Sequence, residues 1–242
     1  MSAALVVSIG TTHPQNVAGL GRDARVAADY GAAHASIVAA VSAQDERGVH
    51  GIFVLPPDFV RAQLCAIDFT RARAVRVGAL GSAEIAAAVC EILRQVAVPI
   101  VFDPALAASA GGALYEGDAL EAVRAVLAGT HAIVTPNLDE AQRLTSCAIE
   151  SVDDMIAAAR QLVEQGASAA LVTGGHLPGE PVDVLVRGGD SWTFADTRLP
   201  QKMRGTGCAL AMALACELAR GRDLVAAVKG ARAYVRTNIA RS

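Results

Sequence analysis

A glycine-rich motif near the C-terminal end of the chain has residue types suited to binding an anion. Gly205, Thr206, Gly207 and Cys208 open an alanine-rich segment, 207–220, that predicts a helix. Small residues at a helix start leave backbone N–H groups free to face an anion, and the helix dipole adds positive potential. Such an anion hole suits a phosphoryl group in transfer, and its field would lower the pKa of Cys208, so that the thiol could accept or orient a hydroxyl proton. The alternative is a tight turn beside an inert cysteine.

A carboxylate and an amide stand three residues apart in Asn137-Leu138-Asp139-Glu140, directly after an apolar run that predicts a strand. Asn137 and Glu140 would share one face of a helix start, where they could hold Mg²⁺ through water molecules. The alternative is a variant of the capping box, with Asn137 as N-cap and Glu140 at the third helical position. Asp103, before Pro104, is a further candidate for the outer shell of the metal, or a simple turn residue.

Three further places could contact a ligand. Gly174 and Gly175 end a predicted strand and would let a phosphate chain approach the backbone closely, or they form only a turn. Gln44 could donate to and accept from a heterocycle at two points. Asp23 lies on the first predicted helix, where a solvent-facing charge is the plain alternative.

Short apolar runs alternate with amphipathic stretches, which predicts repeated β-α units and a doubly wound, mostly parallel sheet with helices on both faces. The expected strands are 4–9, 35–41, 74–77, 99–102, 132–135 and 169–173, and the expected helices are 17–30, 57–68, 82–96, 118–128, 139–144 and 152–165. Strands 182–186 and 192–194 flank Gly188-Gly189-Asp190 and predict a late antiparallel hairpin, before helices 207–220 and 224–239. With no linker or repeat in view, we expect one domain over residues 1–242.

Polar and glycine clusters follow several of these predicted strands. They are Gly10-Thr11-Thr12-His13, Gln44-Asp45, Asp103-Pro104, Pro136-Asn137 and Gly174-Gly175-His176. In doubly wound sheets, ligands bind outside the carboxyl ends of the strands. We therefore expect the functional site on that edge of the sheet.

Composition excludes several classes of protein. The formal net charge is −3 and the pI is near 5.9, which argues against nucleic acid or an anionic membrane as a partner. Neither lysine, Lys202 or Lys229, stands in a P-loop frame. The five cysteines form no C-x-x-C pair, so a structural zinc site is not expected, and the odd, scattered count suits the reducing cytoplasm. No apolar run is long enough to span a membrane.

The order of the motifs resembles the ribokinase-like superfamily and, within it, the hydroxymethylpyrimidine and hydroxymethylpyrimidine-phosphate kinases of thiamine biosynthesis. The resemblance runs from Ser8 to about Ile239. It is carried by Ser42-Ala43-Gln44, Gly48-Val49-His50-Gly51, Phe59-Val60-Arg61-Ala62-Gln63-Leu64, Gly78-Ala79-Leu80-Gly81, Phe102-Asp103-Pro104, Thr135-Pro136-Asn137-Leu138-Asp139-Glu140-Ala141, Gly174-Gly175-His176-Leu177 and Gly205-Thr206-Gly207-Cys208. Cysteine in place of aspartate after Gly-Thr-Gly is similar to the pyrimidine kinases and unlike the sugar kinases.

The resemblance implies an ATP- and Mg²⁺-dependent kinase, and it assigns roles to particular positions. Cys208 matches the catalytic position, and Gly205, Thr206 and Gly207 match its anion hole. Asp23 and Gln44 match the pyrimidine contacts, with Gly10, His13 and Leu80 also on the substrate side. The nucleotide side comprises Asn137, Glu140, Thr173, Gly174, Gly175 and Arg204, with Glu140 and Asp103 toward the metal. The family also implies a homodimer.

The chain departs from the family pattern in three places. The first loop has His13 in place of an acid and Asn16 and Val17 in place of two glycines. Thr173 stands where the family has a lysine, and Arg204 where it has a histidine. These changes leave open whether the alcohol, its monophosphate or both are phosphorylated. They also keep two alternatives: a kinase for another heterocyclic alcohol, of the pyridoxal or pyrimidine type, and a non-catalytic paralogue that binds pyrimidine or nucleotide.

Overall fold

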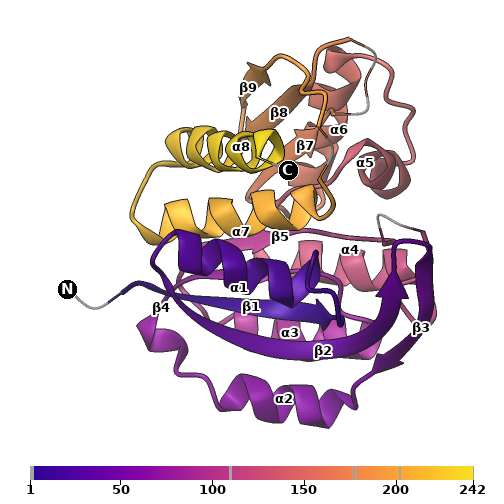
Figure 1. The fold of residues 1–242 in the computed structure, drawn as a ribbon, viewed down its shortest axis with the longest axis vertical. Coiled ribbons are helices and arrows are strands. Elements are labelled where there is room, and N and C mark those ends of the chain that lie inside the picture. Colours follow the sequence, from indigo (N-terminus) through magenta and orange to yellow (C-terminus); the bar gives the residue numbers. More distant parts are fainter. Residues whose placement is uncertain (1–2, 109–110, 176, 178, 202, 242) are drawn as a thin grey trace.

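A nine-stranded sheet forms the centre of the structure, a computed structural model that describes residues 3–108, 111–175, 177, 179–201 and 203–241 (Figure 1). The strand order is β3-β2-β1-β4-β5-β6-β7-β8-β9. β1, β2, β4, β5, β6 and β7 run parallel to one another. β3, at one edge of the sheet, pairs antiparallel with β2, and β8 pairs antiparallel with β7. The strands are β1 (Leu5–Thr12), β2 (Ala33–Asp45), β3 (Gly48–Val54), β4 (Ala72–Val77), β5 (Ile100–Phe102), β6 (Ile133–Val134), β7 (Ala169–Thr173), β8 (Val182–Arg187) and β9 (Asp190–Ala195).

Helices cover both faces of the sheet. The helices are α1 (Gly19–Asp29), α2 (Pro57–Cys65), α3 (Ala83–Leu93), α4 (Ala119–Thr130), α5 (Leu138–Thr145), α6 (Val152–Glu164), α7 (Thr206–Ala219) and α8 (Leu224–Ala240). One core cluster joins the sheet to α2, α3, α4, α5 and α6, and a second joins it to α1, α7 and α8. The expected α/β architecture with two helical layers is confirmed.

Local sequence explains where several helices begin. Ser82, Asp118, Ser151 and Asp223 are N-cap residues whose side chains accept from backbone N–H groups of the first turn. β5 and β6 are continuous apolar runs, and β7 is apolar up to Thr173, because helices cover both of their faces. The late hairpin β8–β9 also forms as predicted, and Gly188 takes the positive φ of 58° that its turn requires.

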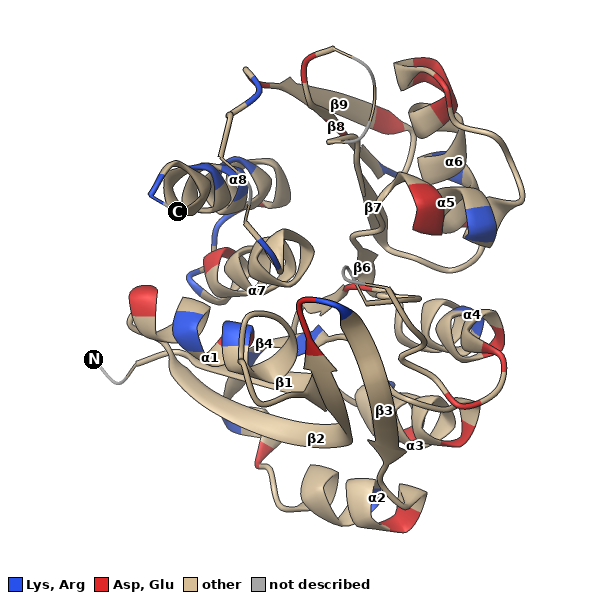
Figure 2. Cartoon of the chain, turned by 45° about the vertical axis from the view of Figure 1, so that its right-hand side comes forward, with Lys and Arg blue, Asp and Glu red and all other residues tan. Residues whose placement is uncertain are grey.

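An early hairpin was not predicted. β2 continues to Asp45 and turns back into β3, so that Gln44 pairs with Val49 inside the sheet. The two glycines of β3, Gly48 and Gly51, weaken its strand pattern, and the turn lacks an Asn-Gly or Asp-Gly pair. The turn is instead held by Asp45, whose Oδ1 accepts from the backbone N–H of Arg47 at 2.7 Å. Figure 2 shows acidic and basic residues at this turn.

Candidate active site

The carboxyl ends of the parallel strands bring the polar residues together, as the topology predicts. Asp103 directly follows β5, and its N–H donates to Val77 at the end of β4. Asn137 follows β6 and forms a parallel bridge with Thr173, the last residue of β7. The N–H of Thr173 donates to Pro136 at 2.9 Å. Residues far apart in sequence therefore line one edge of the sheet.

A buried arginine that the sequence analysis did not single out lies at the centre of this edge. Arg76 on β4 is 1% exposed and binds two carboxylates, with Nη1 3.2 Å from Asp23 Oδ2 and Nη2 2.5 Å from Asp103 Oδ2. A charged side chain inside the expected strand 74–77 was the available clue, because arginine is almost never fully buried without a partner.

Asp23 is fully buried, so its interpretation as a solvent-facing helix charge is wrong. Burial, opposed by Arg76, raises the pKa of Asp23 to about 6. Burial would lower the pKa of Arg76, but the Asp23 and Asp103 carboxylates raise it, so the guanidinium stays charged. Asp23 is thereby joined to Asp103 through one cation.

Cys208 lies in the first turn of α7 against this cluster. Burial and the Asp103 carboxylate raise the pKa of the Cys208 thiol to about 12, although Arg76 acts in the opposite direction. The expected lowering by the helix dipole is therefore wrong for this environment, because desolvation and a neighbouring negative charge outweigh it. At neutral pH the thiol is protonated and can donate or accept a hydrogen bond.

The start of α7 is shaped by two glycines with different surroundings. Gly205 has a φ of 72°, and a Cβ at this position would lie 2.1 Å from the carbonyl oxygen of Val17. The start of α7 is thus packed tightly against the first loop. Gly207 is exposed, and a Cβ there would meet no atom within 4 Å. Open space beside free N–H groups of a helix start is the arrangement expected of an anion hole.

Asn137 and Glu140 form a reciprocal capping box at the start of α5. Asn137 Oδ1 accepts from the N–H of Glu140 at 2.9 Å, and Glu140 Oε2 accepts from the N–H of Asn137 at 2.9 Å. The capping interpretation is confirmed, and it also holds the Glu140 carboxylate in place beside Asp103. Burial and Asp103 raise the pKa of Glu140 to about 7.

This pair of carboxylates fits a Mg²⁺ ion that takes its other ligands from phosphate and water. Among the described residues no group of three or more His, Cys, Asp or Glu side chains could form a complete metal cage. Mg²⁺ commonly uses one or two carboxylates together with substrate phosphates. The raised pKa of Glu140 reflects burial first and the neighbouring Asp103 carboxylate second, and a bound cation would offset both.

The altered first loop is held to the start of α7 by arginines. Arg22 donates from Nε to the Val17 carbonyl at 3.1 Å and from Nη2 to the Arg204 carbonyl at 3.1 Å. Arg204 in turn donates from Nη2 to the Asp45 carbonyl at 3.1 Å. Arg22 was not among the predicted site residues. These bonds tie the first loop, the β2–β3 turn and the anion hole into one wall.

His13 is buried within this wall at 5% exposed. Its Nε2 accepts from the N–H of Ala18 at 3.2 Å, so Nδ1 carries the proton of the neutral ring. That Nδ1 has no hydrogen-bond partner among the described residues. Burial lowers the pKa of His13, and Arg204 acts in the same direction.

The remaining predicted residues occupy the same edge with different exposure. Gly10 is a buried residue of β1, and Gln44 is half-buried on β2, where its Oε1 accepts from Ser42 at 3.4 Å. Leu80 is 1% exposed, and its N–H donates to Tyr115 Oη at 3.4 Å. The Leu80 side chain is therefore part of the core, and its backbone N–H is bound to Tyr115.

The glycine pair after β7 also divides into a packed and an open position. A Cβ on Gly174 would lie 2.1 Å from the Val182 carbonyl oxygen, whereas one on Gly175 would meet nothing within 4 Å. The N–H of Gly174 donates to Asp183 Oδ1 at 3.1 Å. His176, also in this motif, lies outside the described residues.

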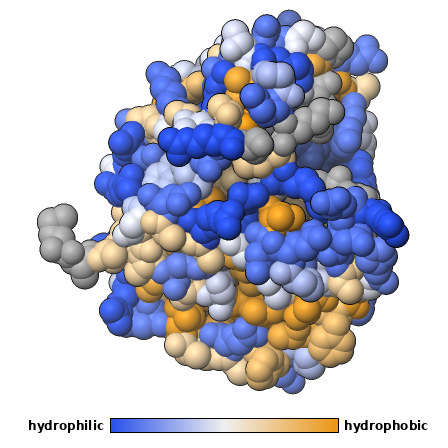
Figure 3. Space-filling view, viewed as in Figure 1, coloured by the Kyte–Doolittle hydropathy of each residue, from blue (hydrophilic) through white to orange (hydrophobic). Residues whose placement is uncertain are grey.

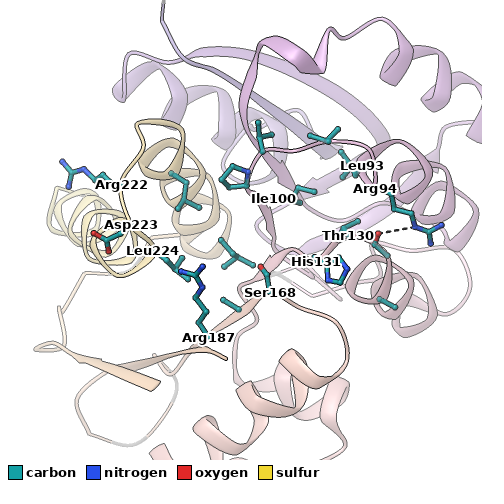
Figure 4. Close-up of a pocket in the computed structure, with 18 residues that line it drawn as sticks. Leu93, Arg94, Ile100, Thr130, His131, Ser168, Arg187, Arg222, Asp223 and Leu224 are labelled. Atoms are coloured by element: carbon teal, nitrogen blue, oxygen red, sulfur yellow. Dashed lines mark hydrogen bonds between the residues drawn. The ribbon is translucent and has the colours of Figure 1, made fainter. Parts of the chain in front are cut away.

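A cavity of about 790 Å³ lies away from this edge (Figure 4). Its lining includes Ile100, Ile133 and Ala169, the first residues of β5, β6 and β7, together with Arg187 and His131. None of the predicted site residues lines it. The candidate site is the carboxyl edge, where the Asp103 and Glu140 carboxylates lie near the open start of α7.

The layered α/β sheet, with the open start of α7 and the Asp103 and Glu140 carboxylates at its carboxyl edge, has the architecture of the ribokinase-like kinases. The model of the family described as phosphomethylpyrimidine kinase matches residues 14–242. The chain belongs to the phosphomethylpyrimidine kinase family, and the expectation of a thiamine-pathway kinase is confirmed at this level.

Individual relatives and structures agree with this family. The chain is 37% identical to the hydroxymethylpyrimidine/phosphomethylpyrimidine kinase of Streptomyces coelicolor over 96% of this chain and 87% of the relative. The crystal structure of a phosphomethylpyrimidine kinase from Clostridium difficile 630 matches with a TM-score of 0.85 and 28% identity, covering 98% and 99% of the two chains. An ADP complex of Bacillus subtilis pyridoxal kinase matches with a TM-score of 0.84 and 25% identity over 96% and 89%.

The described residues contain no helix with the length and apolar character needed to cross a membrane.

Proposed function

We propose that the chain transfers the γ-phosphoryl group of ATP to 4-amino-5-hydroxymethyl-2-methylpyrimidine, to its monophosphate or to both, in thiamine biosynthesis or salvage. The observation that carries this proposal is the convergence of the open start of α7 with Asp103 and Glu140 at one edge of the sheet. The family and the named activity of its Streptomyces coelicolor relative supply the substrate class.

Catalysis in this site would depend on position and electrostatics. The substrate oxygen attacks the γ-phosphorus, the bond to the β-phosphate oxygen of ATP breaks, and ADP leaves, while the hydroxyl proton passes to solvent or to a nearby acceptor. Phosphoryl transfer passes through a loose transition state, so a strong base is not required. The protonated Cys208 thiol would orient the oxygen, and N–H groups of the Gly205–Cys208 turn would bind the charge of the transferred group.

Mg²⁺ would be held by Asp103 and Glu140, where it would screen the negative charge of the nucleotide phosphates. The capping box fixes Glu140 for this purpose, and Arg76 fixes Asp103. Asn137, Thr173, Gly174, Gly175 and Arg204 would form the nucleotide side, and Gly10, His13, Asp23, Gln44 and Leu80 the pyrimidine side. Asp23 would act from beneath the site, since it is fully buried against Arg76.

The test is an assay of ATP consumption with identification of the product, with the alcohol and the monophosphate offered separately. Turnover of either substrate with Mg²⁺ supports the proposal and defines its range. If the folded protein phosphorylates neither compound, the proposed function is wrong. Binding of ADP without turnover would instead support a paralogue that binds pyrimidine or nucleotide.

A kinase for another heterocyclic alcohol is the second candidate, because the first loop departs from the family and the Bacillus subtilis neighbour is a pyridoxal kinase. The same assay with pyridoxal and pyrimidine analogues tests it. Faster turnover of pyridoxal than of the pyrimidine would favour this candidate.

We further propose a homodimer and a cytoplasmic location. Val41, Phe53 and Phe59 are large apolar side chains that are 42%, 66% and 58% exposed. Figure 3 shows apolar residues over the lower part of the face that it draws. A patch of this kind is typical of an interface. All five cysteines are free thiols, which suits a reducing compartment. The mass in solution tests the dimer.

A further inference from the structure

The loop that follows β7 is held by a single arginine from a distant segment. Arg198 lies in the connector between β9 and α7, and it donates from Nη1 to Gly175 O at 2.8 Å and from Nη2 to Leu177 O at 3.0 Å. Its Nη2 and Nε also donate to Gly179 O, at 2.8 and 3.1 Å. One guanidinium therefore binds three carbonyl groups of one loop.

The backbone of Arg198 strengthens the same attachment. Its N–H donates to Glu180 Oε2 at 2.6 Å, so that both the main chain and the side chain bind the loop between β7 and β8. A planar guanidinium presents its N–H groups in a rigid fork, and an ammonium group could not reach the same three carbonyls together. The contacts fix the path of the loop at several points.

The loop and the connector lead to the two halves of the proposed nucleotide site. Gly174 and Gly175 begin the loop beside Thr173, which is bridged to Asn137. The connector runs from Arg198 into Arg204 and the anion hole at Gly205–Cys208. Arg198 thus joins the segment that would border one end of the phosphate chain to the segment that would bind the other.

The residues of the loop explain why it needs the contacts with Arg198. A Cβ on Gly175 would meet no atom within 4 Å, and the Thr173 side chain carries no positive charge that could bind a phosphate. A glycine such as Gly175, with no packing around it, loses conformational entropy when a ligand orders it, and prior ordering reduces that loss.

We propose that Arg198 is a positioning residue for nucleotide binding. It orders Gly175, Leu177, Gly179 and Glu180 of the loop after β7 and fixes them to the connector that enters α7. This inference depends on the proposed function, because it takes the loop to border the nucleotide. Arg198 itself is committed to carbonyl groups and need not touch the ligand. Its effect is therefore expected on nucleotide affinity and not on the affinity for the heterocycle.

The test compares the Arg198→Ala, Arg198→Lys and Arg236→Ala variants. Arg236 is the matched control, because it donates to Thr197 O at 2.9 Å on the same connector but makes no described contact with the loop. Calorimetric titration with ADP and Mg²⁺ gives the nucleotide affinity. Steady-state kinetics with ATP and the pyrimidine gives KM for each substrate and kcat.

We expect Arg198→Ala to weaken ADP binding and raise KM for ATP by about tenfold, with KM for the pyrimidine within twofold of the unaltered protein. Arg198→Lys should recover part of the loss, and Arg236→Ala should bind ADP like the unaltered protein. Hydrogen exchange of the Gly174 and Leu177 amides should accelerate in Arg198→Ala alone, a readout that does not depend on turnover.

The possible failures are distinguishable. If the unaltered protein binds ADP and Arg198→Ala binds it equally well, the role of Arg198 is wrong while the proposed function stands. If Arg236→Ala weakens ADP binding as much as Arg198→Ala, the carbonyl contacts are not the cause. If the unaltered protein binds no ADP, the nucleotide site and the role of Arg198 are both wrong.

Discussion

Arg76 Nη2 lies 2.5 Å from Asp103 Oδ2, and the same guanidinium reaches Asp23 on α1. The pair joins the middle of the sheet to the residue that follows β5, where the proposed metal and phosphate would lie. Because Arg76 is buried between the two carboxylates, it contributes to the stability of the fold and also fixes the orientation of Asp103.

Replacing Arg76 with methionine should destabilise the protein strongly. Breaking a buried ion pair from one side leaves uncompensated carboxylates and costs about 3–5 kcal/mol. The matched control is Arg61→Met, because Arg61 forms a partly exposed pair with Glu91, for which a loss of at most about 1 kcal/mol is expected. Chemical denaturation measures both, and equal losses would contradict the special role of the buried pair.

Gly78→Ala tests the position of Arg76 without removing its charge. A Cβ at Gly78 would lie 2.2 Å from Arg76 Nη1, so the guanidinium must move away from Asp23. We expect a loss of about 1–3 kcal/mol in stability and at least about tenfold lower kcat/KM. Gly51→Ala is the control, since a Cβ there meets nothing within 4 Å. Unchanged kinetics in Gly78→Ala would show that this geometry is not needed.

Gly207→Ala should separate activity from stability. The added methyl group enters open space, so the folded protein should unfold at the same or a slightly higher temperature. The methyl group would occupy space beside the anion hole, and kcat should fall by at least about tenfold. Gly205→Ala should instead lower both stability and activity, because its Cβ meets Val17 O at 2.1 Å. Full activity of Gly207→Ala would place the transferred phosphoryl group elsewhere.

Cys208 can be tested with two substitutions. If the protonated thiol orients the substrate oxygen, Cys208→Ser should retain more turnover than Cys208→Ala, because a hydroxyl can still form hydrogen bonds. For Cys208→Ala we expect kcat lower by about 10²-fold, the lower end of general acid–base effects. Initial rates at saturating ATP measure this. Full turnover of Cys208→Ala would remove Cys208 from the mechanism.

The raised pKa of Glu140 predicts that the stability of the metal-free protein depends on pH. Its pKa is raised to about 7 in the folded protein, above its usual value of 4.5, so the folded state binds more protons between these values. The stabilisation is complete below pH 4.5 and is lost as the pH rises through 7. Asp23 acts in the same direction, with a pKa of about 6.

Thermal unfolding from pH 5 to pH 8 measures this loss. Glu140→Gln should flatten part of the profile, and Mg²⁺ with ADP should restore stability at the upper end of the range. Stability that rises over this interval without metal, and is unchanged in Glu140→Gln, would contradict the raised pKa of Glu140.

The sequence alone determined the layered α/β fold, the late hairpin and the edge of the sheet where the candidate site residues gather. The reason is that these depend on local patterns: apolar runs for buried strands, caps such as Ser82 and Ser151, and polar residues where parallel strands end. The capping box of Asn137 and Glu140 was likewise visible as a spacing of three residues.

Only the tertiary structure decided which charges face one another. Arg76, Asp23 and Asp103 come from three elements, and burial reverses the effect that the helix dipole alone would have on Cys208. The same holds for Arg198, whose contacts with Gly175, Leu177 and Gly179 cross a hairpin. Desolvation and long-range pairing depend on distances in space, and a local sequence pattern does not contain those distances.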